Sequence, residues 1–248
     1  MNFNIDWQIK NPGKTVVLQD TAALLDYVAE QFIKLGCSIQ KEKDFFSVIL
    51  GGGRTPVMLN ARLVNMADQL DWTRIKFFFS DDRCVPPEHP DSNFRMIHET
   101  LVKPLRIPSS NVFRIKGELD PENTATQYEH TLYKVFGNSN IPCFDLALLG
   151  LGPDGHTASL FPGENHVLNE KSKLVVPAGK GPEGHERITL TYSVINQASN
   201  IWFMISGKEK KEVFHNIING NYNPLECPAQ GIKPVNGELV YMVDQSVF

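Results

Sequence analysis

The sequence predicts one α/β domain over residues 1–248, with a largely parallel, doubly wound sheet and helices on both of its faces. An apolar run, a loop rich in glycine or charge, and a helical segment follow one another four times along the chain. This alternation is typical of parallel sheets whose strands are joined by helices. The chain has 248 residues, of which 42% are hydrophobic, and this is enough for one sizeable core.

The first unit begins with a strand-like run at residues 45–50, FFSVIL, which stops at three glycines, residues 51–53. A helix should follow these glycines. Thr55 suits the N-cap, Pro56 suits the first helical position, and the apolar residues that come next can form one helix face.

Two further units repeat this order. The apolar run at 75–80, IKFFFS, ends in a charged segment at 81–83, which we expect to be a loop, and a helix should start near Ser92. The apolar run at 144–149, FDLALL, is followed by a glycine-rich loop at 150–156. Both runs have the composition of buried strands.

The fourth unit has a strand at 201–205, IWFMI, and a lysine-rich helix after Gly207. Two segments interrupt this alternation of strands and helices. Residues 104–124 are rich in Pro, Ser and Asn, and residues 177–186, PAGKGPEGHE, are the best candidate for a mobile loop. Neither segment indicates a domain boundary, so we expect a single Rossmann-like domain.

Charge and targeting signals exclude several classes of function. The formal net charge is −4, so there is no basic surface for nucleic acid or an anionic membrane. The first seven residues, MNFNIDW, lack a basic segment followed by an apolar run, and no stretch approaches the length of a membrane span. These features predict a cytoplasmic protein with no membrane or nucleic-acid partner.

Cysteine and histidine spacing indicates no metal site. The four cysteines are widely separated and form no C-x-x-C pair, which is consistent with a reducing compartment. The histidines other than His156 show neither an i, i+4 pair nor an H-E-x-x-H pattern, so we interpret them as surface or core residues; they are His89, His98, His130, His166, His185 and His215.

Polar residues collect where the predicted strands end, which is where open α/β sheets bind ligands. Residues 51–56, GGGRTP, have the glycines, hydroxyl and following helix of a phosphate-binding turn. They match neither G-x-x-x-x-G-K-[ST] nor G-x-G-x-x-G, so nothing specific indicates a nucleotide. An ordinary strand-to-helix turn is the alternative.

Asp81, Asp82 and Arg83 directly follow a very apolar strand. A carboxylate there can orient a polyol or accept a proton from it, and the alternative is a capped turn with a local ion pair. His156 lies in the glycine-dense segment 152–163 and can take a proton from water and return it to a leaving oxygen. Asp154 is close enough in sequence to orient it, and the alternative is a structural histidine in a turn.

Arg187 and Lys210 are further candidates for binding an anion. Arg187 begins the alternating run RITLTY, and Lys210 follows Gly207 at the start of the last helix. The alternative for each is a solvated surface charge, which is what a lone lysine on a helix usually is. A nucleophilic serine is not indicated, because no G-x-S-x-G pattern is present and Ser159 is followed by Leu-Phe-Pro.

Residues 144–163, FDLALLGLGPDGHTASLFPG, resemble the signature of the 6-phosphogluconolactonases, in the group that also contains the glucosamine-6-phosphate isomerases and deaminases. The deaminases share the G-x-D-G-H core but continue IAFNEP, whereas this chain continues with residues 157–162, TASLFP. Supporting segments are 52–56, 81–86, 91–94, 187–191, 207–210 and 228–229. The chain departs from the family's usual SGGSTP at residues 51–56 and from Asp-Glu-Arg at residues 81–83.

This resemblance implies hydrolysis of 6-phosphogluconolactone to 6-phosphogluconate in the oxidative pentose phosphate pathway, with no metal or organic cofactor. It implies that His156 activates water and then protonates the ring oxygen, that Asp154 holds the imidazole, and that Arg83 stabilises charge or binds hydroxyls, with Asp81 beside them. The phosphate-binding residues that it implies are Gly52, Gly53, Arg54, Thr55, Arg187 and Lys210.

Two alternatives stay open at this point. A deaminase or isomerase would use Asp81 as the base on a carbon acid, and a sugar-phosphate sensor on the same fold would have no turnover. The expected partner is a small sugar-phosphate lactone, and the expected assembly is a monomer or a weak homodimer.

Overall fold

The main sheet in the computed structural model has seven strands in the order β1-β10-β9-β6-β2-β3-β5, and its pairings are all parallel. The model describes residues 13–137 and 141–248, so residues 1–7, used above for the targeting prediction, lie outside the described ranges. The strands are β1 Lys14–Leu18, β2 Phe46–Leu50, β3 Ile75–Phe79, β5 Val112–Phe113, β6 Leu146–Leu149, β9 Asn200–Ile205 and β10 Glu238–Asp244.

A second, antiparallel sheet has the order β4-β8-β7. Its strands are β4 Asp81–Arg83, β7 Val175–Lys180 and β8 Glu186–Leu190. The helices are α1 Thr21–Glu42, α2 Arg54–Asn65, α3 Asn93–Ile97, α4 Pro121–Phe136, α5 Asn165–Leu168, α6 Tyr192–Ile195 and α7 Lys211–Asn219. Among the described residues, no helix is long and apolar enough to cross a membrane.

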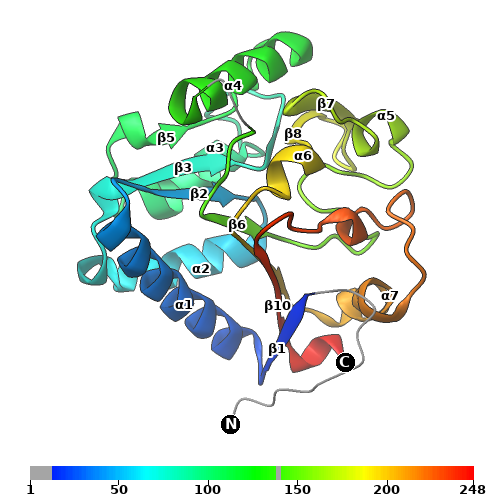
Figure 1. The fold of residues 1–248 in the computed structure, drawn as a ribbon, viewed down its shortest axis with the longest axis horizontal. Helices are drawn as coiled ribbons and strands as arrows, with labels where there is room; N and C mark the ends of the chain where they lie inside the picture. The colour runs from blue at the N-terminus through cyan, green and yellow to red at the C-terminus, as the bar shows by residue number, and fades with distance from the viewer. Residues whose placement is uncertain (1–12, 138–140) are drawn as a thin grey trace.

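The helices lie on the two sides of the main sheet (Figure 1). The chain moves from β1 through β2 and β3 to β5 in one direction along the sheet and then returns through β6, β9 and β10. Since crossovers between parallel strands are right-handed, α1, α2 and α3 cover one face, and α4 and α7 cover the other. The predicted fold class, a largely parallel, doubly wound single domain, is confirmed.

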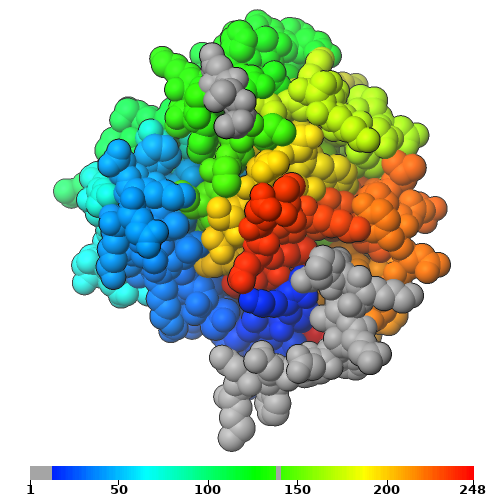
Figure 2. Space-filling view, viewed as in Figure 1, coloured from blue at the N-terminus to red at the C-terminus, as the bar shows by residue number. Residues whose placement is uncertain are grey.

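The central strands are buried because helices cover both faces. All residues of β2 and β6 are buried, as expected for strands inside a parallel sheet. Asp145 joins these two strands near their start, where its carboxylate accepts hydrogen bonds from the backbone N–H and hydroxyl of Ser47, at 2.9 and 2.7 Å. At the edge of the sheet, β1 pairs with β10, and Lys14 lies opposite Val240. Figure 2 shows the blue atoms of the N-terminal described segment against orange-red atoms from the C-terminal part of the chain.

The order of the strands reverses between the adjacent parallel strands β2 and β6. The connection after β2 leads to α2 and β3, whereas the connection after β6 leads toward β9 on the other side. The loops that leave two such neighbouring strands separate, and open a crevice at the carboxyl end of the sheet. This arrangement brings the glycine loops at 51–53 and 150–156 together.

Three local predictions are wrong. Residues 81–83 form β4 rather than a loop, because they pair with β8, which lies far away in sequence. Residues 177–186 contain the last part of β7, a turn and the first residue of β8, because these two strands pair with each other as a hairpin. Gly53, not Thr55, is the N-cap of α2, so Pro56 is the third helical residue. In contrast, α3 starts beside Ser92 as predicted, and Ser92 is its N-cap, with its hydroxyl accepting from the N–H of Arg95.

Candidate active site

A cavity of about 300 Å³ lies at the crevice between β2 and β6. Pockets for small molecules commonly have volumes from about 300 Å³ upward. It is lined by both glycine loops, by β4 and β8 of the small sheet, by the turn between β7 and β8, and by residues 204–210. Of the ten predicted site residues, this lining includes all but Asp154: Gly52, Gly53, Arg54, Thr55, Asp81, Arg83, His156, Arg187 and Lys210.

The first glycine loop can approach a ligand closely. Gly52 has no room for a side chain, because a Cβ there would lie 2.0 Å from the Oδ1 of Asn93. Gly53 has φ of +112° and begins the 12-residue helix α2. The first N–H groups of a helix have no partner within the helix, and they carry the positive end of its dipole, so this loop suits an anion.

His156 and Asp154 form a short, direct pair. The Nδ1 of His156 lies 2.6 Å from the Oδ1 of Asp154, and this oxygen also accepts the backbone N–H of His156 at 3.1 Å. Gly152 permits this geometry, since a Cβ there would lie 2.1 Å from the same Nδ1. Partial burial raises the pKa of Asp154, but its hydrogen bonds and its attraction to His156 outweigh this and lower the pKa.

The tautomer of His156 follows from this contact. An ionised carboxylate only accepts hydrogen bonds, so the imidazole proton is on Nδ1 and the lone pair is on Nε2. The ring packs near Phe161, with 5.0 Å between centroids. The arrangement is that of a general base oriented by a carboxylate.

Arg83 and Arg187 face each other across the small sheet. The antiparallel pairing of β4 with β8 places them in register. Glu183 lies between the two guanidinium groups and accepts from the Nη2 of Arg83 at 3.0 Å and from the Nη2 of Arg187 at 2.5 Å. Partial burial raises the pKa of Glu183, but the two arginines outweigh it and bring the pKa to about 2.

Asp81 is buried, and its carboxylate accepts hydrogen bonds from three side chains. Its Oδ2 accepts from the hydroxyl of Ser159 at 2.7 Å and from the Nη1 of Arg187 at 3.3 Å, and its Oδ1 accepts from the hydroxyl of Ser80 at 2.9 Å. Both carboxylate oxygens are therefore already in hydrogen bonds. Ser159 is 0% exposed and donates to this carboxylate, which fits the prediction that it is not a nucleophile.

Lys210 and Arg54 form a different cationic group. Among residues 13–137 and 141–248, the Lys210 ammonium has no hydrogen-bond or ion-pair partner. Burial lowers the pKa of Lys210, the carboxylates of Glu209 and Asp154 oppose this, and the positive charge of Arg54 lowers it further. Arg54 is exposed at the start of α2 and also lines the cavity.

The family model described as "Glucosamine-6-phosphate isomerases/6-phosphogluconolactonase" matches residues 19–241. The chain belongs to this family. A 6-phosphogluconolactonase of Nostoc sp. is 34% identical over 93% of this chain and 95% of its own length, and one of Homo sapiens is 35% identical over 91% and 87%. The crystal structure of a 6-phosphogluconolactonase from Thermotoga maritima has a TM-score of 0.82 and 33% identity, and covers 93% of this chain and 99% of its own.

Two side chains next to the cavity of this family member, Glu183 and Asn93, were not predicted as site residues. Glu183 belongs to the segment predicted as a mobile loop. Only the alternation of polar and apolar residues at 187–191 indicated that a strand follows it and that it lies in the turn between β7 and β8. Asn93 accepts from the Nη1 of Arg83 and donates to the carbonyl of Asp81 at 3.0 Å. Its signal in the sequence was its place in segment 91–94, which supported the family resemblance without giving Asn93 a role.

Asp82 is buried beside the site and holds the start of α3 in place. It is 2% exposed and accepts the backbone N–H groups of Asn93 and Phe94 at the start of α3, at 2.7 and 3.0 Å. Burial raises its pKa to about 6, against the lowering effect of these N–H groups and that of Arg83. The carboxylate thus fixes α3, and with it Asn93, relative to β4.

Proposed function

We propose that this protein hydrolyses 6-phospho-D-glucono-1,5-lactone to 6-phospho-D-gluconate, the second step of the oxidative pentose phosphate pathway. The observation that carries this proposal is the pairing of His156 with Asp154 at 2.6 Å beside a cavity lined by cations and by a glycine loop. The family membership and the lactonase names of its relatives support the same reaction.

His156 supplies the proton chemistry. Its Nε2 accepts a proton from a water molecule as the water oxygen attacks the lactone carbonyl, and the resulting imidazolium is stabilised by the Asp154 carboxylate. When the bond between the carbonyl carbon and the ring oxygen breaks, the same Nε2 returns the proton to that ring oxygen. The products are a carboxylic acid, which ionises, and a free hydroxyl.

Arg83 stabilises negative charge that develops on the carbonyl oxygen, because a planar guanidinium offers several donors in a fixed geometry. Its Nε–H is buried and, within the described part of the chain, has no hydrogen-bond partner. Asn93 and Glu183 orient it. The glycine loop at 52–55, with Arg54 and Lys210, provides the site for the 6-phosphate, whereas Arg187, which was predicted with them, is paired with Asp81 and Glu183.

A deaminase or isomerase reaction would require Asp81 as a base. Both of its carboxylate oxygens already accept hydrogen bonds, which come from Ser80, Ser159 and Arg187. A histidine with a free Nε2 is the better base in this cavity. Release of ammonia from glucosamine 6-phosphate would identify the alternative reaction directly.

The test is a lactonase assay on freshly generated 6-phosphoglucono-δ-lactone, corrected for its spontaneous hydrolysis. We expect turnover by the full-length protein, and we expect His156→Ala to lower kcat by roughly 10²–10⁴ while 6-phosphogluconate still binds. His166→Ala is a matched control, because His166 also contacts a carboxylate, that of Glu164 at 3.3 Å, but is outside the cavity lining. Binding without turnover in the wild type would identify a sensor instead.

We also propose that the protein acts in the cytoplasm as a monomer or a weak homodimer. All four cysteines are free, which supports a reducing compartment. Sedimentation at several protein concentrations tests the assembly state.

A further inference from the structure

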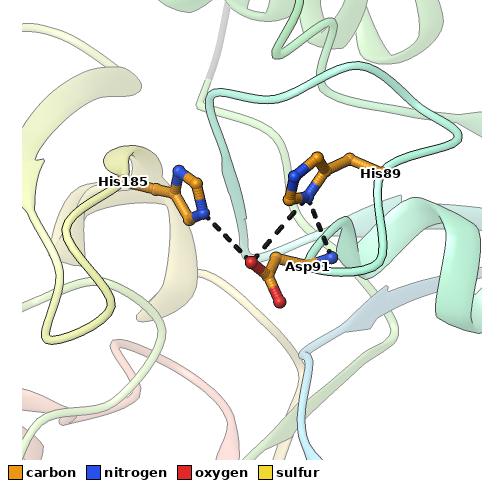
Figure 3. Close-up of side chains that lie close together, drawn as sticks. All are labelled: His89, Asp91 and His185. Carbon is orange, nitrogen blue, oxygen red and sulfur yellow. Dashed lines mark hydrogen bonds and ion pairs between the residues drawn. The ribbon is translucent and has the colours of Figure 1, made fainter.

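Three metal-binding side chains meet at the rim of the small sheet. His89 and Asp91 lie in the segment between β4 and α3, and His185 lies at the end of the turn that precedes β8. One potential ligand atom from each of the three lies within 4.8 Å of those of the other two. Figure 3 shows both imidazole rings directed at one carboxylate oxygen of Asp91. No sequence spacing joins these residues, and both histidines were interpreted above as surface or core residues.

The distances are close to those of a coordination sphere. The Oδ2 of Asp91 lies 3.0 Å from the Nε2 of His185 and 3.8 Å from the Nδ1 of His89. In a tetrahedral site with bonds of about 2.0 Å, neighbouring ligand atoms are about 3.3 Å apart. The two histidine nitrogens lie within 4.8 Å of each other, so side-chain rotations that bring the three atoms to this spacing convert the cluster into three ligands of one ion.

The protonation pattern also suits a metal. The backbone N–H of Asp91 donates to the Nδ1 of His89 at 3.2 Å, so this nitrogen carries a lone pair, and a bound metal would take the place of that N–H. The Nε2 of His185 becomes a ligand when the ring proton moves to Nδ1, since either nitrogen of a neutral imidazole can bind a metal. The carboxylate supplies the only formal negative charge of the three.

We propose that His89, Asp91 and His185 bind a divalent transition-metal ion, with Zn²⁺ the preferred species. Two imidazoles and one carboxylate are suitable ligands for Zn²⁺, whereas Mg²⁺ and Ca²⁺ prefer oxygen alone. The side chains are 38%, 46% and 32% exposed, which leaves a fourth position open to water. The site is separate from His156, and the ion is not a participant in lactone hydrolysis.

The bound ion would connect two segments that also carry the catalytic cavity. The segment with His89 and Asp91 follows Arg83, and the turn with His185 carries Glu183 and precedes Arg187. At present the two segments are joined here by the ion pair of Arg83 with Glu183 and the contact of Asp91 with His185. A metal bond between them stabilises the folded state, because the unfolded chain does not hold the three ligands together.

The experiment titrates full-length protein, stripped of metal with a chelator, with Zn²⁺ in a calorimeter and with Co²⁺ in a spectrophotometer. The exposed thiol of Cys143 competes for these ions, so every variant carries Cys143→Ser. We expect one equivalent to bind, a visible Co²⁺ spectrum with nitrogen and oxygen ligands, and a rise in Tm with Zn²⁺.

His185→Ala, His89→Ala and Asp91→Asn should each weaken Zn²⁺ binding at least tenfold and abolish the rise in Tm. His166→Ala is the matched control, because His166 and Glu164 form an exposed pair without a third ligand, and it should bind like the parent. Circular dichroism without metal verifies that each variant is folded. Absence of saturable binding in the parent, or equal affinity in the parent and in folded His185→Ala and Asp91→Asn, would overturn the proposal.

Discussion

Replacing Asp154 separates two contributions of the catalytic pair, namely the placement of the imidazole and the choice of its tautomer. The Oδ1 of Asp154 contacts both the Nδ1 and the backbone N–H of His156, at 2.6 and 3.1 Å. Asp154→Ala removes both contacts. Asp154→Asn keeps the shape of the side chain, but it can turn an amide N–H toward Nδ1.

The structure gives different magnitudes for the two variants. A hydrogen bond to a charged group contributes about 1.5–3 kcal/mol. Because the Asp154 side chain is 45% exposed, we take the lower end, which corresponds to about a tenfold loss of kcat in Asp154→Ala. In Asp154→Asn the amide favours the tautomer with the proton on Nε2, so the base is lost and kcat should fall by roughly 10²–10⁴.

The assay is lactone hydrolysis corrected for the spontaneous rate, together with the ¹⁵N spectrum of the His156 ring. The spectrum should show the proton on Nδ1 in the wild type and on Nε2 in Asp154→Asn. Binding of 6-phosphogluconate and Tm serve as controls for folding. If Asp154→Asn were as active as the wild type, or more active than Asp154→Ala, Asp154 would not set the tautomer of His156.

Three further substitutions test the surrounding residues. Arg83→Lys should leave kcat well below that of the wild type, because an ammonium cannot contact Asn93 and Glu183 as a planar guanidinium does; full activity would mean that only a positive charge is needed. Lys210→Ala should weaken calorimetric binding of 6-phosphogluconate about 10-fold or more and leave the weak binding of gluconate unchanged; equal losses for both ligands would place Lys210 outside the phosphate site. Because burial raises the pKa of Asp82 from 3.8 to about 6, its contribution to stability is complete below pH 3.8 and is lost as the pH rises through 6. The unfolding free energy of the wild type minus that of Asp82→Asn, measured with denaturant, should therefore fall by ~2 kcal/mol between pH 4 and 7, and a rise over this range would contradict the direction of the shift.

The four strand-loop-helix units were predictable because each is encoded locally. In β2, β3, β6 and β9, a short apolar run is largely buried and is followed within two residues by glycine or a charged residue. The second sheet was not predictable in this way. Its pairing joins Asp81 to a strand whose Arg187 lies 106 positions later, and β4 is three residues long and highly charged.

The same distinction applies to the site. Residues in contiguous motifs, such as His156 with Asp154, could be predicted because their partner lies two positions away. Glu183 could not be predicted, since its partner Arg83 lies 100 positions earlier. The cluster of His89, Asp91 and His185 also depends on the hairpin returning to β4, so its residues had no recognisable spacing in the sequence.

The distribution of charge indicates which cations receive the phosphate. Arg83 and Arg187 are already compensated, because Glu183 contacts both and Asp81 contacts Arg187. Removing Arg187 would also leave the carboxylate of Asp81 buried without its cation, so Arg187→Ala should destabilise the fold by about 3–5 kcal/mol and is a poor test of binding. The ammonium of Lys210 is half-buried, and burial lowers its pKa, which is the signature of a cation that lacks an adequate counter-charge. A phosphate beside Lys210, Arg54 and the first N–H groups of α2 would supply that charge, and so we expect the phosphate at this end of the cavity and the lactone ring between it and Arg83.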